Sequence, residues 1–376
     1  MTAFFQNYEQ IKLEIHSPEL TNIIILSLFI LTTLLFKNRK HEKTSGLLHF
    51  QHTEQLKGLA IFLVVLGHLW VHVAKQRPYL VLSGDAVSMF LILSGFGLTI
   101  SSGSKKIELK KFLRKRINRV MVPYWITTVL ILLLDYIVLN KILNTKSMIL
   151  TLFGVNVTTD LYHLDYVRWF ITLILCWYVI FFILQKNITI YRRTLIYLFL
   201  GTGFTLSEYY FFHFGWYQFL SFPTGCIIAC YYKKLNRLWD ANQKTIVGFA
   251  VASMFIAIVY KMIIDSEQIW PYLVHSIPSI ILTFIAEGNS ILLSLSIFVI
   301  VSYMGEKGFN SRFLLFLGRY SYELFLVHGV FLIKYNMFFI QPNPLSIAVG
   351  FILFFVFILG ISIIISKIAR TAYLKM

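Results

Sequence analysis

The sequence predicts an all-α, polytopic transmembrane helix bundle of about eleven spans. Of its 376 residues 57% are hydrophobic and only 14% are charged, and the mean hydropathy is +0.72. These values lie far from those of soluble globular chains. Apolar runs that are long enough, or nearly long enough, to cross a bilayer recur along the chain. They lie at about 20–36, 56–74, 83–101, 121–140, 167–185, 193–206, 215–231, 245–264, 289–304, 313–334 and 345–366.

The first run, 20–36, is expected to remain as an anchor. Acidic residues precede it and lysines follow it, which is unlike a cleavable signal peptide. We expect residues 1–51 to form an extracytoplasmic N-terminus, one extra transmembrane anchor and a basic cytoplasmic linker. Residues 52–376 are then the membrane core, which holds the other ten spans.

The basic residues between the runs predict the orientation. If 37–57 is cytoplasmic, every second connection and the C-terminal tail are cytoplasmic too, and these segments hold 25 of the 34 Lys and Arg. The positive-inside rule therefore places the N-terminus outside and the C-terminus in the cytoplasm. The stretch 265–288 is ambiguous, because prolines and Glu287 interrupt it; it is either a span or an extracytoplasmic or re-entrant segment.

The net charge of +17 does not indicate nucleic-acid binding. The basic residues lie in short clusters between apolar runs, without a basic module or an RNA-binding motif. The three cysteines lie in apolar stretches and lack the further ligands of a zinc site, so no metal is predicted.

Lys57 and His68 are the strongest pointer to chemistry. Eleven residues of α-helix return to within about 20° of the same face and rise about 16 Å, so one ligand can touch both side chains. An ionisable group inside a span usually faces the bundle interior or a water-filled cavity. Neutral imidazole suits a general base, while the ordinary alternative is a histidine bonded to a neighbouring helix. His72 lies one turn further out.

The segment 105–120 reads as an amphipathic helix at the cytoplasmic surface. Most of its lysines fit contact with anionic lipids and topology. Arg116 and Arg119 share a face at i, i+3, and their planar guanidinium groups suit phosphate.

Two further spans carry candidate residues. Asp85 lies near the outer end of 83–101, where it would orient His68 or His72 or sit in water, whereas Ser94-Gly95-Phe96-Gly97 fits close helix packing. In 313–334, Arg319 and Glu323 are placed at i, i+4 to neutralise each other or to act directly. His328, in the same span, is either a second site histidine or a bond to another helix.

Four motifs together resemble the integral-membrane acyltransferase family 3. Lys57-x10-His68 is similar to its Arg/Lys-x10-His motif, and Phe90-Leu91-Ile92-Leu93-Ser94-Gly95-Phe96 to its Ser-Gly-Phe span. Arg116-x-x-Arg119 followed by Pro123-Tyr124 resembles its cytoplasmic Arg-x-x-Arg and Pro-Tyr. Gly318-x-x-Ser321-Tyr322-x-Leu324-x-Leu326-x-His328 is similar to its late Ser-Tyr-x-Leu-Tyr-Leu-x-His segment.

The resemblance implies an acyl-CoA-dependent O-acyltransferase of the bacterial cytoplasmic membrane. Such proteins move an acyl group, commonly acetyl, from cytoplasmic acyl-CoA to a hydroxyl of a cell-surface glycan or exopolysaccharide, or of a lipid-linked glycan. Lys57, Arg116 and Arg119 would bind the acyl-CoA phosphates, and His68 would act as general base or as transient acyl carrier. His72, Asp85, Glu323 and His328 are possible catalytic or orienting residues.

Two other classes fit the same composition. A polysaccharide exporter or other transporter would also have many spans with intramembrane polar groups, although no internal repeat is visible. A structural or signalling membrane protein would use the cationic segment only for lipid contact.

Overall fold

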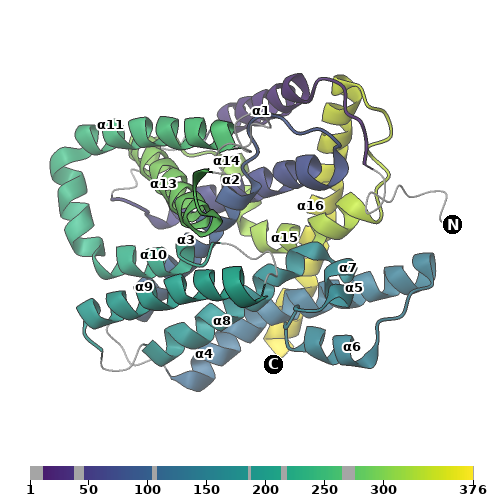
Figure 1. The fold of residues 1–376 in the computed structure, drawn as a ribbon, viewed down its shortest axis with the longest axis horizontal. Coiled ribbons are helices and arrows are strands. Elements are labelled where there is room, and N and C mark those ends of the chain that lie inside the picture. The colour runs from purple at the N-terminus through teal and green to yellow at the C-terminus, as the bar shows by residue number, and fades with distance from the viewer. Residues whose placement is uncertain are drawn as a thin grey trace.

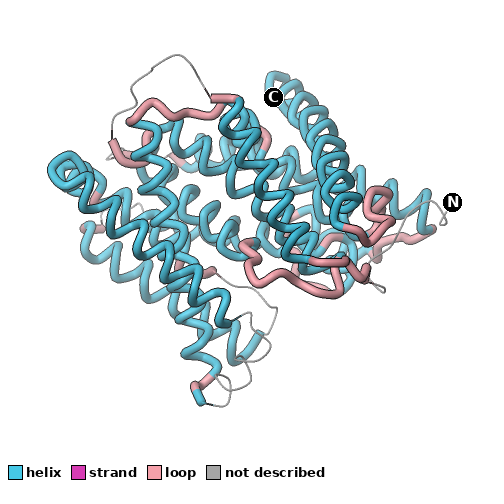
Figure 2. The backbone as a smooth tube through the Cα atoms, turned by 90° about the horizontal axis from the view of Figure 1, so that it is seen from above, coloured by secondary structure: helices cyan, strands magenta, loops and turns pink. Residues whose placement is uncertain are grey.

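The computed structural model describes residues 12–37, 46–103, 108–184, 188–212, 218–264 and 276–375. Helices and connecting loops make up this part of the chain (Figure 2). The two isolated β-bridges join Leu13 to Ala74 and Lys37 to Ser311. The predicted all-α fold is therefore confirmed.

Eight helical segments of the described chain are long and apolar enough to cross a membrane. They are α1 (Pro18–Leu35), α2 with a following π turn η2 (Phe50–His68, Leu69–Val73), α3 (Ser83–Ser102), α4 with η3 and α5 (Leu109–Arg116, Ile117–Met121, Val122–Leu139), η4 with α8 (Tyr166–Arg168, Trp169–Leu184), α11 (Tyr232–Ile264), α13 (Ser279–Glu306) and α16 (Pro344–Lys375).

The remaining helices are shorter or less apolar. They are α6 (Thr145–Leu152), α7 (Thr159–Leu164), α9 with the π turn η5 (Ile190–Ser207, Glu208–Phe212), α10 (Ser221–Cys230), α14 (Arg312–Arg319) and α15 (Ser321–Ile333). Each of the eleven predicted apolar runs overlaps at least one of the helices, but α9, α10 and α15 fall outside the set of eight.

Two predicted boundaries are wrong, and they also bear on the stretch 265–288 that the sequence left open. The run 313–334 is not one helix, because the chain breaks at Tyr320 between α14 and α15. The run 289–304 starts too late, since α13 begins at Ser279 and contains Glu287. The stretch 265–288 is thus helical from Ser279 onward, while its part 265–275 lies outside the described residues.

Glu287 is tolerated inside α13 because the next layer satisfies its carboxylate. The backbone N–H groups of Gln218, Phe219 and Leu220 donate to it at 3.1–3.4 Å, at the start of α10. Orphan N–H groups at a helix N-terminus are natural partners for a carboxylate. A residue that interrupts the hydropathy pattern therefore fastens two helices together.

Long helices enclose the middle of the molecule. Figure 1 shows α16 running the height of one side and α11 turning a corner on the opposite side. The corner coincides with Asn242, whose φ of −132° is non-helical. Between them, α2 is buried along most of its length, with Leu56, Ala60, Ile61 and Val64 fully covered.

Glycines let the central helices approach to backbone contact. A Cβ on Gly318 of α14 would lie 2.0 Å from the carbonyl oxygen of Glu54 in α2, and one on Gly58 would lie 2.2 Å from that of Leu314. Likewise, a Cβ on Gly95 of α3 would lie 2.3 Å from the carbonyl oxygen of Phe222 in α10. The predicted packing role of the Ser-Gly-Phe-Gly segment is confirmed for Gly95, whereas Gly97 faces open space.

Candidate functional site

The helix α2 carries Lys57 and His68 on one uninterrupted α-helix. It begins at Phe50 and keeps α-helical geometry to His68, so the predicted rise of about 16 Å between the two residues applies. The π turn η2 follows at once and contains His72. Single π turns of this kind are frequent at functional sites.

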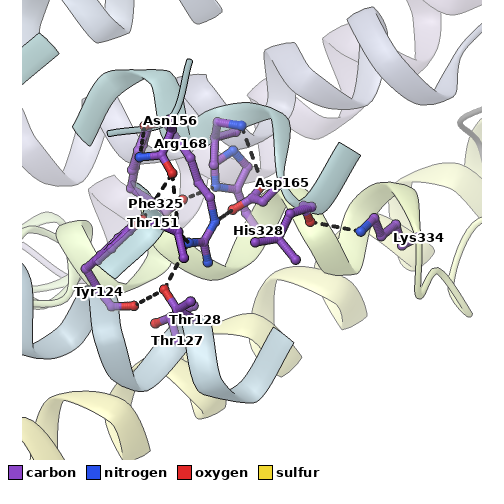
Figure 3. Close-up of polar contacts among 12 residues, drawn as sticks. Tyr124, Thr127, Thr128, Thr151, Asn156, Asp165, Arg168, Phe325, His328 and Lys334 are labelled. Atoms are coloured by element: carbon purple, nitrogen blue, oxygen red, sulfur yellow. Dashed lines mark hydrogen bonds and ion pairs between the residues drawn. The ribbon is translucent and has the colours of Figure 1, made fainter. Parts of the chain in front are cut away.

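His68 and His328 meet in the middle of the bundle. Nδ1 of His68 lies 2.8 Å from Nε2 of His328, and the two rings are nearly parallel. The other ring nitrogen of His328 lies 2.8 Å from the carbonyl oxygen of Phe325 and 3.2 Å from that of Leu324. Figure 3 shows this contact of His328 with Phe325. The structure therefore joins two histidines that are 260 residues apart in the sequence.

The contacts of His328 fix the tautomers of both neutral rings. A carbonyl oxygen only accepts, so Nδ1 of His328 carries the proton and Nε2 is left as an acceptor. Nδ1 of His68 must then donate to Nε2 of His328. The lone pair of His68 consequently lies on its Nε2, on the edge of the ring that faces away from His328. His328 is fully buried, whereas His68 is partly accessible.

Two more rings complete the cluster around His68. The ring centroids of His72 and Tyr166 lie 5.4 and 5.1 Å from that of His68, and 3.9 Å from each other. His72 is thus next to His68, as the sequence suggested. Tyr166 was not predicted, because an aromatic residue at the start of an apolar run is common and carries no signal of its own.

A buried ion pair holds the segment that carries Tyr166. Asp165 and Arg168 are 3% and 2% exposed, and Nε of Arg168 lies 3.5 Å from a carboxylate oxygen of Asp165. Burial raises the pKa of Asp165 to about 6, while the Arg168 guanidinium acts in the opposite direction. The carboxyl is therefore mostly ionised at neutral pH. Figure 3 shows the Arg168 side chain reaching from this pair toward α5.

The guanidinium of Arg168 also binds α5 and α6. It donates to the hydroxyls of Thr128 and Thr151 at 2.9 and 3.3 Å and lies 4.9 Å from the ring centre of Tyr124. Sequence reasoning missed this network. Two opposite charges at i, i+3 at the edge of an apolar run are the signal that points to it, since such charges are costly there unless paired.

A large cavity opens beside the first turns of α2, and we call it the basic cavity. Its volume is about 950 Å³, near the upper end of the usual range of ligand sites, which is about 300–1,000 Å³. Six basic side chains and two carboxylates line it: Lys57, Lys115, Arg116, Arg119, Arg319 and Arg370, with Glu54 and Glu323. The three predicted phosphate-binding residues therefore share one cavity.

The three predicted phosphate-binding residues differ in their contacts within the protein. Lys57 forms an ion pair with Glu54, one turn before it on α2. The Arg116 guanidinium lies over the rings of Phe112 and Tyr178, at 5.7 and 5.2 Å from their centres. Arg119 belongs to the π turn η3, which precedes Pro123. Pro123 lacks an N–H group and so favours this irregular turn.

The cavity leads toward the histidine pair along aromatic residues. Phe170 and Phe325 line it, with ring centroids 4.8 Å apart, and the ring of Phe325 lies 5.6 Å from that of His328. On α15, the basic cavity is lined by Ser321, Tyr322, Glu323 and Phe325, and His328 follows about one turn after Phe325.

A second, smaller pocket lies beyond the histidine pair, and we call it the histidine pocket. It measures about 170 Å³, and its walls include Lys12, His72, His163, Asp165, Tyr166 and Lys334. The same two helices thus reach both spaces: α2 and its π turn pass from Lys57 to His72, and α15 from Phe325 to Gly329. His68 and His328 occupy the turns between them.

Two predicted site residues have other partners. Asp85 binds Lys261 at 3.0 Å and accepts a hydrogen bond from Ser290 at 2.7 Å, so it fastens α3 to α11 and α13. Glu323 lines the basic cavity and bonds Ser366, with Arg370 nearby. The ion pairs of the described residues do not include Arg319–Glu323, because the break at Tyr320 removes the i, i+4 geometry.

The described residues contain no group of three or more His, Cys, Asp or Glu placed to hold a metal ion. Comparison with known proteins gave no significant match to a curated protein or to a solved structure. A family model described as an acyltransferase domain matches residues 53–369, which include the histidine pair and the residues of the basic cavity apart from Phe50, Gln51 and Arg370. The chain is therefore a membrane acyltransferase that belongs to acyltransferase family 3.

Proposed function

We propose that this protein transfers an acyl group, acetyl in the first instance, from acyl-CoA to a hydroxyl of a cell-envelope glycan, with His68 as general base. The single observation that carries the proposal is the position of the histidine pair between the basic cavity and the histidine pocket, on helices that line both. Donor and acceptor can then approach His68 from opposite sides.

The basic cavity fits the donor. Coenzyme A carries several phosphate charges at one end and a long thin arm that ends in the thioester. Arg116 and Arg119, as planar donors, suit the phosphates, and Lys57, which is paired with Glu54, lines the same cavity. The rise of about 16 Å from Lys57 to His68 is within reach of the arm.

The tautomer of His68 suits proton abstraction. Its Nε2 lone pair takes the proton of the acceptor hydroxyl as the hydroxyl oxygen attacks the thioester carbonyl carbon. The carbon–sulfur bond breaks, and the proton returns from His68 to the coenzyme A thiolate. His328 keeps the His68 ring in the reactive tautomer through the 2.8 Å contact.

The positive-inside rule gives the proposed orientation of the protein in the membrane. The basic cavity faces the cytoplasm, where acyl-CoA is found, and the histidine pocket faces the outer half of the membrane. The N-terminus is then outside and the C-terminus inside, in a bacterial cytoplasmic membrane. Lipid-linked or exported glycan is accessible from that outer side.

Label transfer from radioactive acetyl-CoA in membranes tests the proposal. His68→Ala is expected to lose transfer to background, while His49→Ala, an exposed histidine just before α2, retains it. Full transfer by His68→Ala would overturn the mechanism. Label bound covalently to the protein and lost in His68→Ala would instead identify His68 as an acyl carrier, a role in which Nε2 is the nucleophile.

A further inference from the structure

The segment of residues 12–16, before α1, lies against the π turn η2, which ends the helix that carries His68. The N–H of Leu13 donates to the carbonyl oxygen of Val73 at 2.8 Å, and the N–H of Lys75 donates to that of Leu13 at 2.8 Å. Ile15 is 1% exposed, and the N–H of His16 donates to Pro342 at 2.8 Å. The segment therefore bridges the end of η2 and the loop before α16.

Further contacts fix α1 to the same region. Nε1 of Trp70 donates to the side chain of Asn22 at 2.9 Å, and the N–H of Tyr79 donates to the carboxylate of Glu19 at 2.7 Å. Asn22 and Glu19 precede position 53, where the family match begins. The N-terminal part thus packs against the π turn η2 and the loop that follows it.

Lys12 brings this segment into the histidine pocket. Its ammonium donates to the carbonyl oxygen of Val71 at 3.0 Å, beside His72, and its side chain lines the pocket. Burial and the neighbouring Arg77 both lower the pKa of Lys12, so a second positive charge stands close to it.

The charge of Lys12 has no carboxylate partner among the described residues. The other charged residues of the pocket are paired: Lys334 with Asp135 at 3.1 Å, and Asp165 with Arg168 at 3.5 Å. The pocket is therefore positive at the wall that Lys12 forms. At about 170 Å³ the pocket lies below the usual range of ligand sites, about 300–1,000 Å³, so its size suits a group no larger than one sugar unit.

We propose that residues 12–16 form the acceptor side of the active site and that Lys12 binds an anionic group of the acceptor, a carboxylate or a phosphate. The inference rests on the proposed function, because it takes the histidine pocket as the acceptor site. An anion on Lys12 would place the neighbouring sugar hydroxyl beside His72 and within the cluster that contains His68.

The experiment uses membranes of the producing cells, which hold the native acceptor, with radioactive acetyl-CoA. Lys12→Arg keeps the charge, Lys12→Gln keeps only an N–H donor for Val71, and Lys12→Glu reverses the charge. Lys75 is the matched control, since its exposed side chain pairs with Glu14 at 3.6 Å outside the pocket. Such surface pairs contribute little.

We expect Lys12→Arg and Lys75→Gln to keep near-wild-type transfer. The rate of label transfer should fall about tenfold in Lys12→Gln and further in Lys12→Glu. The loss should appear in the dependence of the rate on acceptor concentration, while the KM of acetyl-CoA stays unchanged. Mass spectrometry of the labelled product should find a carboxylate or a phosphate on the acylated sugar or its neighbour, and this distinguishes the two anions.

Wild-type transfer by Lys12→Gln and Lys12→Glu, or an uncharged product, would overturn the role of Lys12 while leaving the acyltransferase mechanism in place. A raised KM of acetyl-CoA in these variants would also contradict it. Failure of the wild-type protein to transfer label from any acyl-CoA would instead remove the proposed function on which the inference rests.

Discussion

Nδ1 of His68 and Nε2 of His328 lie 2.8 Å apart, and the only donor available between the two neutral rings is the proton of His68. In the proposed mechanism, His328 is a positioning residue, which acts through the tautomer of His68. The pair resembles other sites in which a second group orients a catalytic imidazole.

The relationship predicts different effects of two substitutions at position 328. His328→Ala removes the acceptor, so we expect kcat to fall by about a hundredfold or more, because the unreactive tautomer of His68 becomes available. His328→Gln offers a side-chain oxygen as acceptor and should retain more activity. The KM of acetyl-CoA should change little in both, as measured by initial rates in membranes. Equal activity of the two variants would contradict an orienting role.

A second prediction concerns the arginines of the basic cavity. Arg116→Lys and Arg119→Lys keep the charge but lose the planar, two-pronged geometry, so we expect the KM of acyl-CoA to rise by about tenfold in each. Raised salt should add to the loss, since it screens phosphate contacts. Arg114→Lys is the control, because Arg114 is exposed on the same helix and lies outside the cavity. Unchanged KM values in all three variants would mean that the arginines contact lipid only.

Spacing along one helix was predictable, and contacts between helices were not. The spacing of eleven residues predicted that Lys57 and His68 share a face of one helix, and it did so because α2 is regular between them. The sequence named His328 as a possible second site histidine, but no spacing predicts its contact with His68, or that of Tyr166 with His72, because these contacts depend on how the bundle packs.

The same limit explains why the partners of Asp85 and the break within the run 313–334 were not predicted. Asp85 is adjacent in space to α13, and only the packed bundle shows that Ser290 and Lys261 occupy its carboxylate. Hydropathy is continuous across 313–334, so it could not reveal that the chain turns at Tyr320, where Gly318 meets the backbone of α2.

A third prediction compares two glycines of α3 that stand two residues apart. Gly95→Ala would place a Cβ 2.3 Å from the carbonyl oxygen of Phe222, so α10 must move, at a cost of about 1–3 kcal/mol. Gly97→Ala meets open space inside a helix and should be neutral or stabilising by up to about 1 kcal/mol. Thermal unfolding of the detergent-solubilised protein measures both. Equal melting temperatures would show that α3 and α10 are not in backbone contact at Gly95.

The last prediction concerns the buried ion pair of Asp135 and Lys334, which joins α5 to the end of α15. Lys334 lies 3.1 Å from the carboxylate of Asp135 and also donates to the carbonyl oxygen of Leu164 at 2.9 Å, while the hydroxyl of Tyr335 donates to Asp135 at 2.5 Å. Both charged side chains are less than 10% exposed. Removing one charge leaves the other buried without its partner, so we expect Asp135→Asn and Lys334→Met each to destabilise the fold by about 3–5 kcal/mol, as measured by unfolding of the solubilised protein.

The double variant separates the pair from its two members. The amide oxygen introduced by Asp135→Asn still accepts from Tyr335, and Lys334→Met leaves no charge to compensate, so the double variant should be more stable than either single one. Glu108→Gln is the control, because the Glu108–Lys111 pair is exposed and such pairs are worth about 0–1 kcal/mol. If the destabilisations of the single variants simply add in the double variant, the two side chains are not coupled, and the join between α5 and α15 depends on apolar packing alone.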